Sequence, residues 1–157
     1  MTLLSVSTNN PLIDGRQSDR AMMVRRGVQV LLADMRFAVL PELTLSNGRR
    51  ADLIALSDKG EIWIVEIKSS LIDFQVDRKW PEYRDYSDKF FFAKPPELDA
   101  AIFPDSEGLI IADGHDGAIV RDSPLTPLAP ARRKALMLKL ARLGADRIHV
   151  LMDPGPK

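Results

Sequence analysis

Two neighbouring runs of the sequence are apolar at both odd and even positions, and this constrains the fold more than any other feature. They are ADLIAL at 51–56 and EIWIVEIKS at 61–69. A strand with one face in water alternates apolar and polar residues, whereas a strand covered on both faces is apolar at both sets of positions. The sequence therefore predicts a β-sheet with helices packed above and below it.

The segments around these runs predict an α/β domain. A helix is expected from Ser18 or Asp19, either a good N-cap, to about Met35, because apolar residues recur there at helical spacing. Further strands are expected at 37–45, 90–94, 109–113 and 118–122, with a short helix at 70–80 before Pro81 and a last helix at 131–143 behind Pro130. The order αβββαβββα describes a mixed β-sheet flanked by helices.

Length and composition limit the classes of protein. The 157 residues suit one domain, expected at 18–152 between a leader at 1–17 and a tail at 153–157. The 22 basic and 22 acidic side chains argue against a polybasic binder, and the absence of cysteine excludes disulfides and thiolate metal sites. No apolar stretch reaches the roughly 18 residues of a membrane span, and the first residues lack the pattern of a signal peptide. A cytoplasmic protein that does not enter the membrane is therefore expected.

Three charged residues interrupt the two apolar runs: Asp52, Glu66 and Lys68. If Asp58-Lys59-Gly60 is a three-residue hairpin loop, Ser57 pairs with Glu61 and Asp52 lies opposite Glu66. Directly opposed residues share a face, and a residue two positions further along lies on the same side. The hairpin thus predicts two carboxylates beside one ammonium group.

Glu42 is a third candidate carboxylate, and its position depends on the preceding turn. A three-residue loop at Ser46-Asn47-Gly48 places Glu42 opposite Asp52, whereas a two-residue Asn47-Gly48 turn shifts the register by one and points Glu42 away. Adjacent carboxylates repel, and a hard cation such as Mg²⁺ or Mn²⁺ keeps them ionised together. The pattern therefore indicates metal-assisted hydrolysis. The alternative is that Lys68 simply neutralises one acid at the end of a sheet.

The run from Arg49 to Ala93, with IVEIKSS at 64–70 and KWPEY at 79–83, resembles the MmcB-like DNA-repair family of bacteria over about residues 19–143. That family belongs to the PD-(D/E)xK nuclease superfamily, so the resemblance implies a restriction-endonuclease-like core. It implies that Asp52 and Glu66 are metal ligands, that the Ile67 carbonyl is a further ligand, and that Lys68 orients or deprotonates the attacking water. The chain departs from many relatives in one respect, because its first helix offers no acid except Asp19 and Asp34 at its ends.

Candidate DNA contacts each have a plainer alternative. Trp80 could stack on an unpaired base or dock the segment after the short helix, and the polar residues nearby could bind phosphate or be ordinary surface. The last helix carries a basic stripe that could bind DNA or be solvated, made of Arg132, Arg133, Lys134, Lys139 and Arg142. The candidates are Arg49, Arg50, Gln75, Lys79, Trp80, Arg132 and Arg133.

Two functions from different classes fit the sequence. The first is a metal-dependent nuclease that cleaves phosphodiester bonds during DNA repair, with branched or single-stranded DNA and other repair proteins as expected partners. The second is a module that binds DNA or protein without cleavage and retains the nuclease fold. The three signature residues favour the enzyme, whereas small size, neutral charge and the missing helix acid favour the module.

Overall fold

The structure is a computed structural model, and it describes residues 18–153, 155 and 156. The leader expected at 1–17 lies outside the described residues. Within the described part of the chain, no helix is long and apolar enough to cross a membrane.

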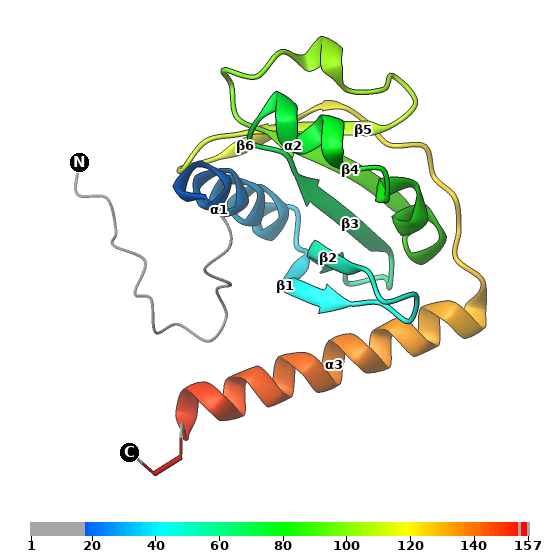
Figure 1. The fold of residues 1–157 in the computed structure, drawn as a ribbon. Helices are drawn as coiled ribbons and strands as arrows, with labels where there is room; N and C mark the ends of the chain where they lie inside the picture. The colour runs from blue at the N-terminus through cyan, green and yellow to red at the C-terminus, as the bar shows by residue number, and fades with distance from the viewer. Residues whose placement is uncertain (1–17, 154, 157) are drawn as a thin grey trace.

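A six-stranded mixed sheet forms the centre of the domain (Figure 1). The strands lie in chain order, antiparallel except that β4 runs parallel to both β3 and β5. They are β1 (Ala38–Thr44), β2 (Arg50–Leu56), β3 (Ile62–Ile67), β4 (Lys89–Lys94), β5 (Gly108–Ala112) and β6 (Gly117–Arg121). The α/β fold and the element order are as the sequence predicts.

In the described part of the chain, three α-helices accompany the sheet: α1 (Asp19–Asp34), α2 (Leu71–Val76) and α3 (Pro130–Met152). Two short 3₁₀ helices, η1 (Trp80–Tyr86) and η2 (Ala100–Ile102), lie in the connections that flank β4. Ser18 caps α1, since its side chain accepts a hydrogen bond from the Ala21 N–H. The expected end of the last helix at 143 was wrong by nine residues. Gly144 costs only about 1 kcal/mol within a helix, and the good helix formers around it carry α3 past that point.

The sheet is covered on both faces, as the two apolar runs predict. Every residue of β3 is buried. One hydrophobic cluster joins α1 to the sheet, and a second joins the other face to Phe74 of α2, Tyr83 of η1 and Leu136 of α3. Helix α3 lies along the edge strand β1, where Lys139 and Arg147 donate hydrogen bonds to backbone carbonyl groups (Figure 1). These contacts satisfy acceptors that an edge strand otherwise leaves exposed.

Both hairpin registers match the three-residue loops. Ser57 N–H donates to the Glu61 carbonyl, and Gly60 has the positive φ of 87° that such a loop requires. Leu45 N–H donates to the Arg49 carbonyl in the same way. The alternative two-residue turn at Asn47-Gly48 is therefore excluded.

Asp88, which precedes β4, connects β3 to the start of α3 through one buried carboxylate. Its Oδ2 accepts hydrogen bonds from Ile62 N–H at 2.7 Å and Arg133 Nη1 at 2.6 Å, while Oδ1 accepts from Leu128 N–H at 2.9 Å and Arg133 Nη2 at 2.7 Å. Burial alone would raise the pKa of Asp88, but the hydrogen bonds from Arg133 and the two backbone groups outweigh it and lower the pKa.

Asp88→Ala is expected to lower the free energy of unfolding by about 3 to 5 kcal/mol, because it leaves Arg133 and two buried N–H groups without their acceptor. Asp122→Ala is the matched control. Asp122 is 65% exposed and pairs with Lys89, so its loss should cost about 1 kcal/mol or less. Urea unfolding of both variants measures the difference. Equal losses would contradict the structural role of Asp88.

Candidate active site

The strands β1 and β2 change their alternation at the same point, and the candidate site lies there. Before Glu42, Val39 packs on the α1 side of the sheet; after it, Leu43 packs on the opposite side, although both are odd positions. The same change occurs around Asp52: Leu53 packs on the α1 side of the sheet, whereas Ala51 packs on the opposite side. Glu42 has a φ of 58°, a conformation that non-glycine residues rarely adopt. The kink brings Asp52 out of the regular ladder.

Asp52 and Glu66 each accept a hydrogen bond from the backbone of the opposite strand. Glu66 Oε1 accepts from Asp52 N–H at 2.9 Å, and Asp52 Oδ2 accepts from Ile67 N–H at 2.8 Å. The regular pairing of β2 with β3 ends next to them, at Leu53 and Val65. Where the strands separate, the two carboxylates accept hydrogen bonds that main-chain carbonyl groups accept in a regular sheet. These hydrogen bonds fix one oxygen atom of each carboxylate.

Burial makes ionisation of this pair unfavourable. Removal from water raises the pKa of Asp52, although the Ile67 N–H and the Lys68 ammonium oppose the shift. Burial and repulsion from Asp52 hold the pKa of Glu66 well above its ordinary value. Glu66 is 4% exposed, so little water compensates its charge. A bound cation would favour the ionised form of both groups.

Lys68 is two residues beyond Glu66 and its ammonium is held by Asp77. The Nζ atom donates to Asp77 Oδ2 at 2.6 Å, and both side chains are largely buried. Burial alone would raise the pKa of Asp77, but the hydrogen bonds from Lys68 Nζ and the Lys79 N–H outweigh it and lower the pKa. Asp77 follows α2, so the crossover between β3 and β4 determines where the lysine lies.

The first helix contributes an arginine to this region. Arg25 is 5% exposed, and its Nη1 lies 4.0 Å from Glu42 Oε1. Burial lowers the pKa of Arg25, while the charges of Glu42 and Asp52 oppose that shift. Arg147 of α3 donates to the carbonyl oxygens of Pro41 and Glu42 and so supports the kinked strand. Glu42 therefore reaches the register position opposite Asp52, as the three-residue loop predicts, and its carboxylate lies beside a cation of the protein.

The remaining candidate DNA contacts near the site differ in how far they are engaged by the fold. Arg49 Nε pairs with Glu82 Oε2, and Arg50, Gln75 and Lys79 are exposed. The Trp80 ring stacks on Phe90 with centroids 6.1 Å apart and meets the edge of Phe92 at 5.2 Å. Trp80 docks its segment onto the sheet, the plainer of the two alternatives.

The two candidates on α3 make contacts within the domain. Arg133 is bound by Asp88 and by the Gly60 carbonyl, so its guanidinium is a structural group. Arg132 donates to the Asp85 carbonyl and lies over the Tyr86 ring at 4.6 Å. Lys134 and Arg142 of the same stripe are exposed.

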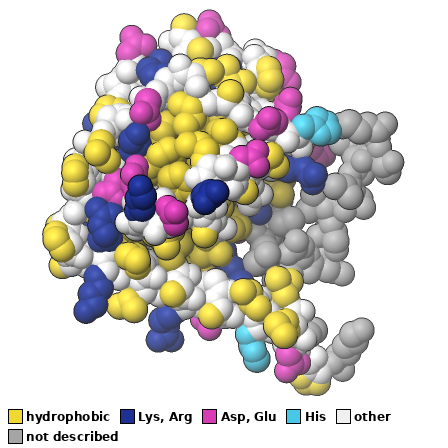
Figure 2. Space-filling view, turned by 180° about the vertical axis from the view of Figure 1, so that it is seen from behind, with side chains coloured by type: hydrophobic (Ala, Val, Ile, Leu, Met, Phe, Trp, Pro, Cys, Tyr) yellow, Lys and Arg dark blue, Asp and Glu magenta, His cyan; other side chains and the backbone are white. Residues whose placement is uncertain are grey.

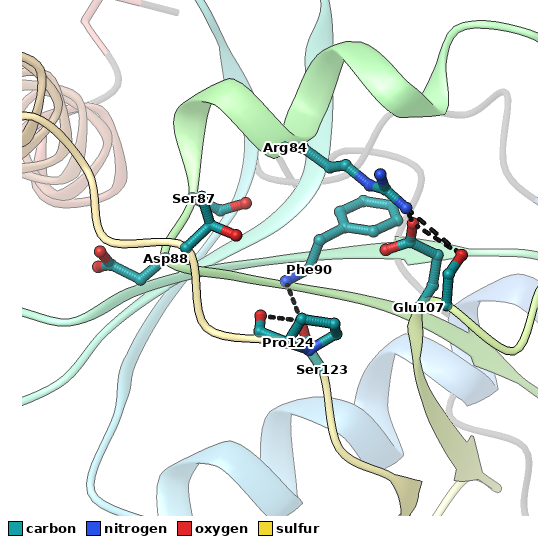
Figure 3. A pocket seen from close by; sticks show the side chains of 9 residues that line it. Arg84, Ser87, Asp88, Phe90, Glu107, Ser123 and Pro124 are labelled. Carbon is teal, nitrogen blue, oxygen red and sulfur yellow. Dashed lines mark hydrogen bonds and ion pairs between the residues drawn. The ribbon is translucent and has the colours of Figure 1, made fainter.

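A small pocket of about 230 Å³ lies elsewhere, beside the start of β4 (Figure 3). Its polar groups bind one another: Arg84 pairs with Glu107, and Ser123 Oγ accepts from Phe90 N–H and donates to the Pro124 carbonyl. Asp88, also in its wall, accepts the bonds described above. These contacts support the scaffold, and the pocket does not include Asp52, Glu66 or Lys68.

Comparison with known proteins supports the fold and identifies the family. A family model described as DNA repair protein MmcB-like matches residues 8–155. The chain belongs to the MmcB-like family. A solved structure, the SPO1766 protein of unknown function from Silicibacter pomeroyi, is 41% identical and has a TM-score of 0.84, covering 88% of this chain and 94% of that one. No curated protein matches. The MmcB-like assignment confirms the predicted family and places the chain in DNA repair.

Sequence reasoning missed Asp77 and Arg25 around the site of this MmcB-like chain, and it considered Tyr83 only as a residue that could stack on a base. Asp77 binds Lys68, Arg25 faces Glu42, and the Tyr83 hydroxyl donates to the Arg50 carbonyl at 2.9 Å. Burial, with the charges of Glu66 and Asp52, raises the pKa of Tyr83, so its phenol stays a donor. For Arg25 a signal was present, since a charge interrupts the apolar stripe of the first helix between Val24 and Val28.

The raised pKa of Glu66 predicts a pH dependence of stability. When a chelator removes metal ions, the unfolded chain loses the Glu66 proton near the ordinary pKa of glutamate, whereas the native protein retains it to higher pH. The native state then binds more protons, so the free energy of unfolding falls as pH rises from about 4.5 toward the native pKa. Glu66→Gln should flatten this fall, and urea unfolding between about pH 5 and 8 measures it.

Glu97→Gln is the control for that measurement. Glu97 is 63% exposed and its pKa is lowered, chiefly by a backbone hydrogen bond. Its replacement should leave the fall in the free energy of unfolding with rising pH unchanged. A wild-type profile that is flat or rises over the same range would refute a strained Glu66 carboxylate.

Proposed function

We propose that this MmcB-like protein is a metal-dependent nuclease that hydrolyses phosphodiester bonds of DNA during repair. The observation that carries the proposal is the half-buried Asp52 beside the buried Glu66 where β2 and β3 separate, with Lys68 two residues further on. Strongly perturbed carboxylates beside a lysine are typical of catalytic sites. The family supports the biological role in DNA repair.

The donor set suits Mg²⁺ or Mn²⁺. Backbone N–H groups hold Asp52 Oδ2 and Glu66 Oε1, and this orients the second oxygen of each carboxylate. Among described residues, Glu42 Oε1 is a buried acceptor without a hydrogen-bond donor, which favours a cation nearby. The described residues contain no cluster of three acidic or histidine side chains that could together bind a metal ion. Magnesium is commonly held by one or two carboxylates together with substrate phosphates, so two suffice.

Each residue of the site has a separate task under this proposal. Asp52 and Glu66 hold the ion, with the Ile67 carbonyl as a further ligand candidate. A bound ion acts as a Lewis acid and lowers the pKa of coordinated water. Lys68 presents an ammonium group whose position Asp77 restricts, and it stabilises negative charge that develops on the phosphate. Tyr83 supports the backbone of Arg50 beside Asp52.

The second candidate is a DNA-binding module that does not cut. Two observations favour it: Arg25 places a buried positive charge beside Glu42, and the Lys68 ammonium is already paired with Asp77. Protein cations then reduce the repulsion between acids without a metal ion. The two candidates make different predictions for cleavage.

The deciding experiment incubates the full chain with plasmid, single-stranded, flapped and four-way-junction DNA, with and without Mg²⁺ or Mn²⁺. Metal-dependent cleavage is expected, and Asp52→Asn or Lys68→Ala should each reduce its rate at least about 100-fold while melting stays cooperative. Asp34→Asn and Lys59→Ala, both at exposed positions, are the matched controls and should cleave at the wild-type rate. Binding without cleavage of any substrate would select the non-catalytic module.

DNA is proposed to approach along the exposed polar residues next to the site. Because Arg133 belongs to the scaffold, Arg50 and Lys79 are better phosphate contacts than the stripe on α3. Arg50→Gln with Lys79→Gln should weaken binding to all sequences and reduce the slope of log K against log salt by up to about 2.

Lys134→Gln with Arg142→Gln serves as the comparison, because it removes the same charge from exposed positions of α3. This double variant should reduce the slope of log K against log salt less than Arg50→Gln with Lys79→Gln does. If it flattens the salt dependence and the first variant does not, DNA lies along α3 instead.

A further inference from the structure

Helix α3 has two apolar faces, of which the fold uses one. Leu136 and Leu140 are buried against the sheet. A second set, Leu138, Ala141, Ala145, Ile148 and Met152, follows the alternating three- and four-residue spacing of a helix-pairing seam. All five are exposed, with Leu138 at 56%, Ile148 at 57% and Met152 at 81%. At 100° per residue, this seam lies more than a quarter turn from the buried face.

The seam begins beside β1 and continues onto the end of α3 that passes beyond the sheet. The C-terminal end of the helix projects past β1 (Figure 1), and Figure 2 shows hydrophobic side chains exposed along this arm at the lower right. Met137 and Leu151 border the seam and are 39% and 52% exposed. A contiguous exposed apolar surface of several hundred Å² marks an interaction site.

The middle of the seam is built from small residues that the domain itself does not require. A Cβ atom added at Gly144 would meet nothing within 4 Å. Glycine inside a helix costs about 1 kcal/mol relative to alanine, and no residue that the structure describes comes close enough to Gly144 to explain it. With Ala141 and Ala145 next to it, Gly144 permits a second helix to approach closely.

We propose that α3 pairs antiparallel with α3 of a second copy of this chain. The exposed lysines and arginines of α3 all precede Asp146, and a second acid, Asp153, directly follows the helix; these bases are Arg132, Lys134, Lys139 and Arg142. Parallel pairing would oppose like charges and align the helix dipoles, whereas antiparallel pairing sets basic halves against acidic ends. With Ala145 on the two-fold axis, Leu138 of one copy faces Met152 of the other, as a self-complementary interface requires.

The exposed area is sufficient for such a dimer. The five large side chains, Met137, Leu138, Ile148, Leu151 and Met152, are 39% to 81% exposed. Covering them in both copies removes on the order of 1,000 Å² of surface, the lower limit for a specific interface. The pairing is independent of the nuclease proposal, because the seam contains no residue of the site.

Light scattering of the full chain across a concentration series tests the pairing. A dimer is expected, and Leu138→Glu with Ile148→Glu should convert it to a folded monomer. Leu125→Glu is the matched control: Leu125 is 59% exposed in the segment before α3, and its replacement should leave the dimer intact. A wild-type monomer at every concentration would overturn the proposal.

Single cysteines distinguish the orientation, because the chain has none of its own. Ala145→Cys lies at the proposed axis and should cross-link readily under mild oxidation, since a disulfide requires Cα atoms about 4.4 to 6.8 Å apart. Met152→Cys should not cross-link, because antiparallel pairing separates the two helix ends by about 20 Å. Rapid cross-linking through Met152→Cys and not through Ala145→Cys would refute the antiparallel arrangement.

Discussion

The cost of placing carboxylates inside a sheet that is covered on both faces governs the architecture around the site. Asp52 and Glu66 cannot be hydrated there as surface acids are, so each takes a backbone N–H of the opposite strand. Those bonds are available only where the regular ladder stops. The kink at Glu42 and Asp52 and the separation of β2 from β3 are therefore linked to the charges they accommodate. A regular, fully paired sheet at this point would leave the same carboxylates without donors.

Positive charge reaches this position from three elements that are distant in sequence. Lys68 comes from the end of β3, Arg25 from α1, and Arg147 of α3 supports the strand that carries Glu42. The balance between these cations and the acids determines how strongly the site attracts a metal ion. Burial raises the pKa of both central carboxylates, and the charge of Lys68 only partly opposes that shift. Under the proposed function, a divalent ion and the substrate phosphate would complete this balance.

Helix α3 combines two physical roles. Along its first turns, Arg133 binds Asp88 and thereby joins the helix to β3 and β4, while Lys139 and Arg147 cover carbonyl groups of the edge strand. These contacts are polar and leave the opposite apolar seam outward. Because α3 covers the edge strand β1, that edge cannot recruit another strand, and the proposed pairing uses the outer face of the same helix.

The sequence by itself determined the features that depend on local chemistry. Turn residues at Gly48 and Gly60 set both hairpin registers, and the register with the two-residue period of strands placed Asp52 against Glu66. Apolar residues at both odd and even positions of two strands predicted that both faces of the sheet are covered. Only the tertiary structure decided that Asp77 holds Lys68, that Arg25 faces Glu42, and that Arg133 is bound by Asp88. The reason is that hairpin neighbours are encoded by turn geometry, whereas contacts between distant elements depend on how helices and crossovers pack against the completed sheet.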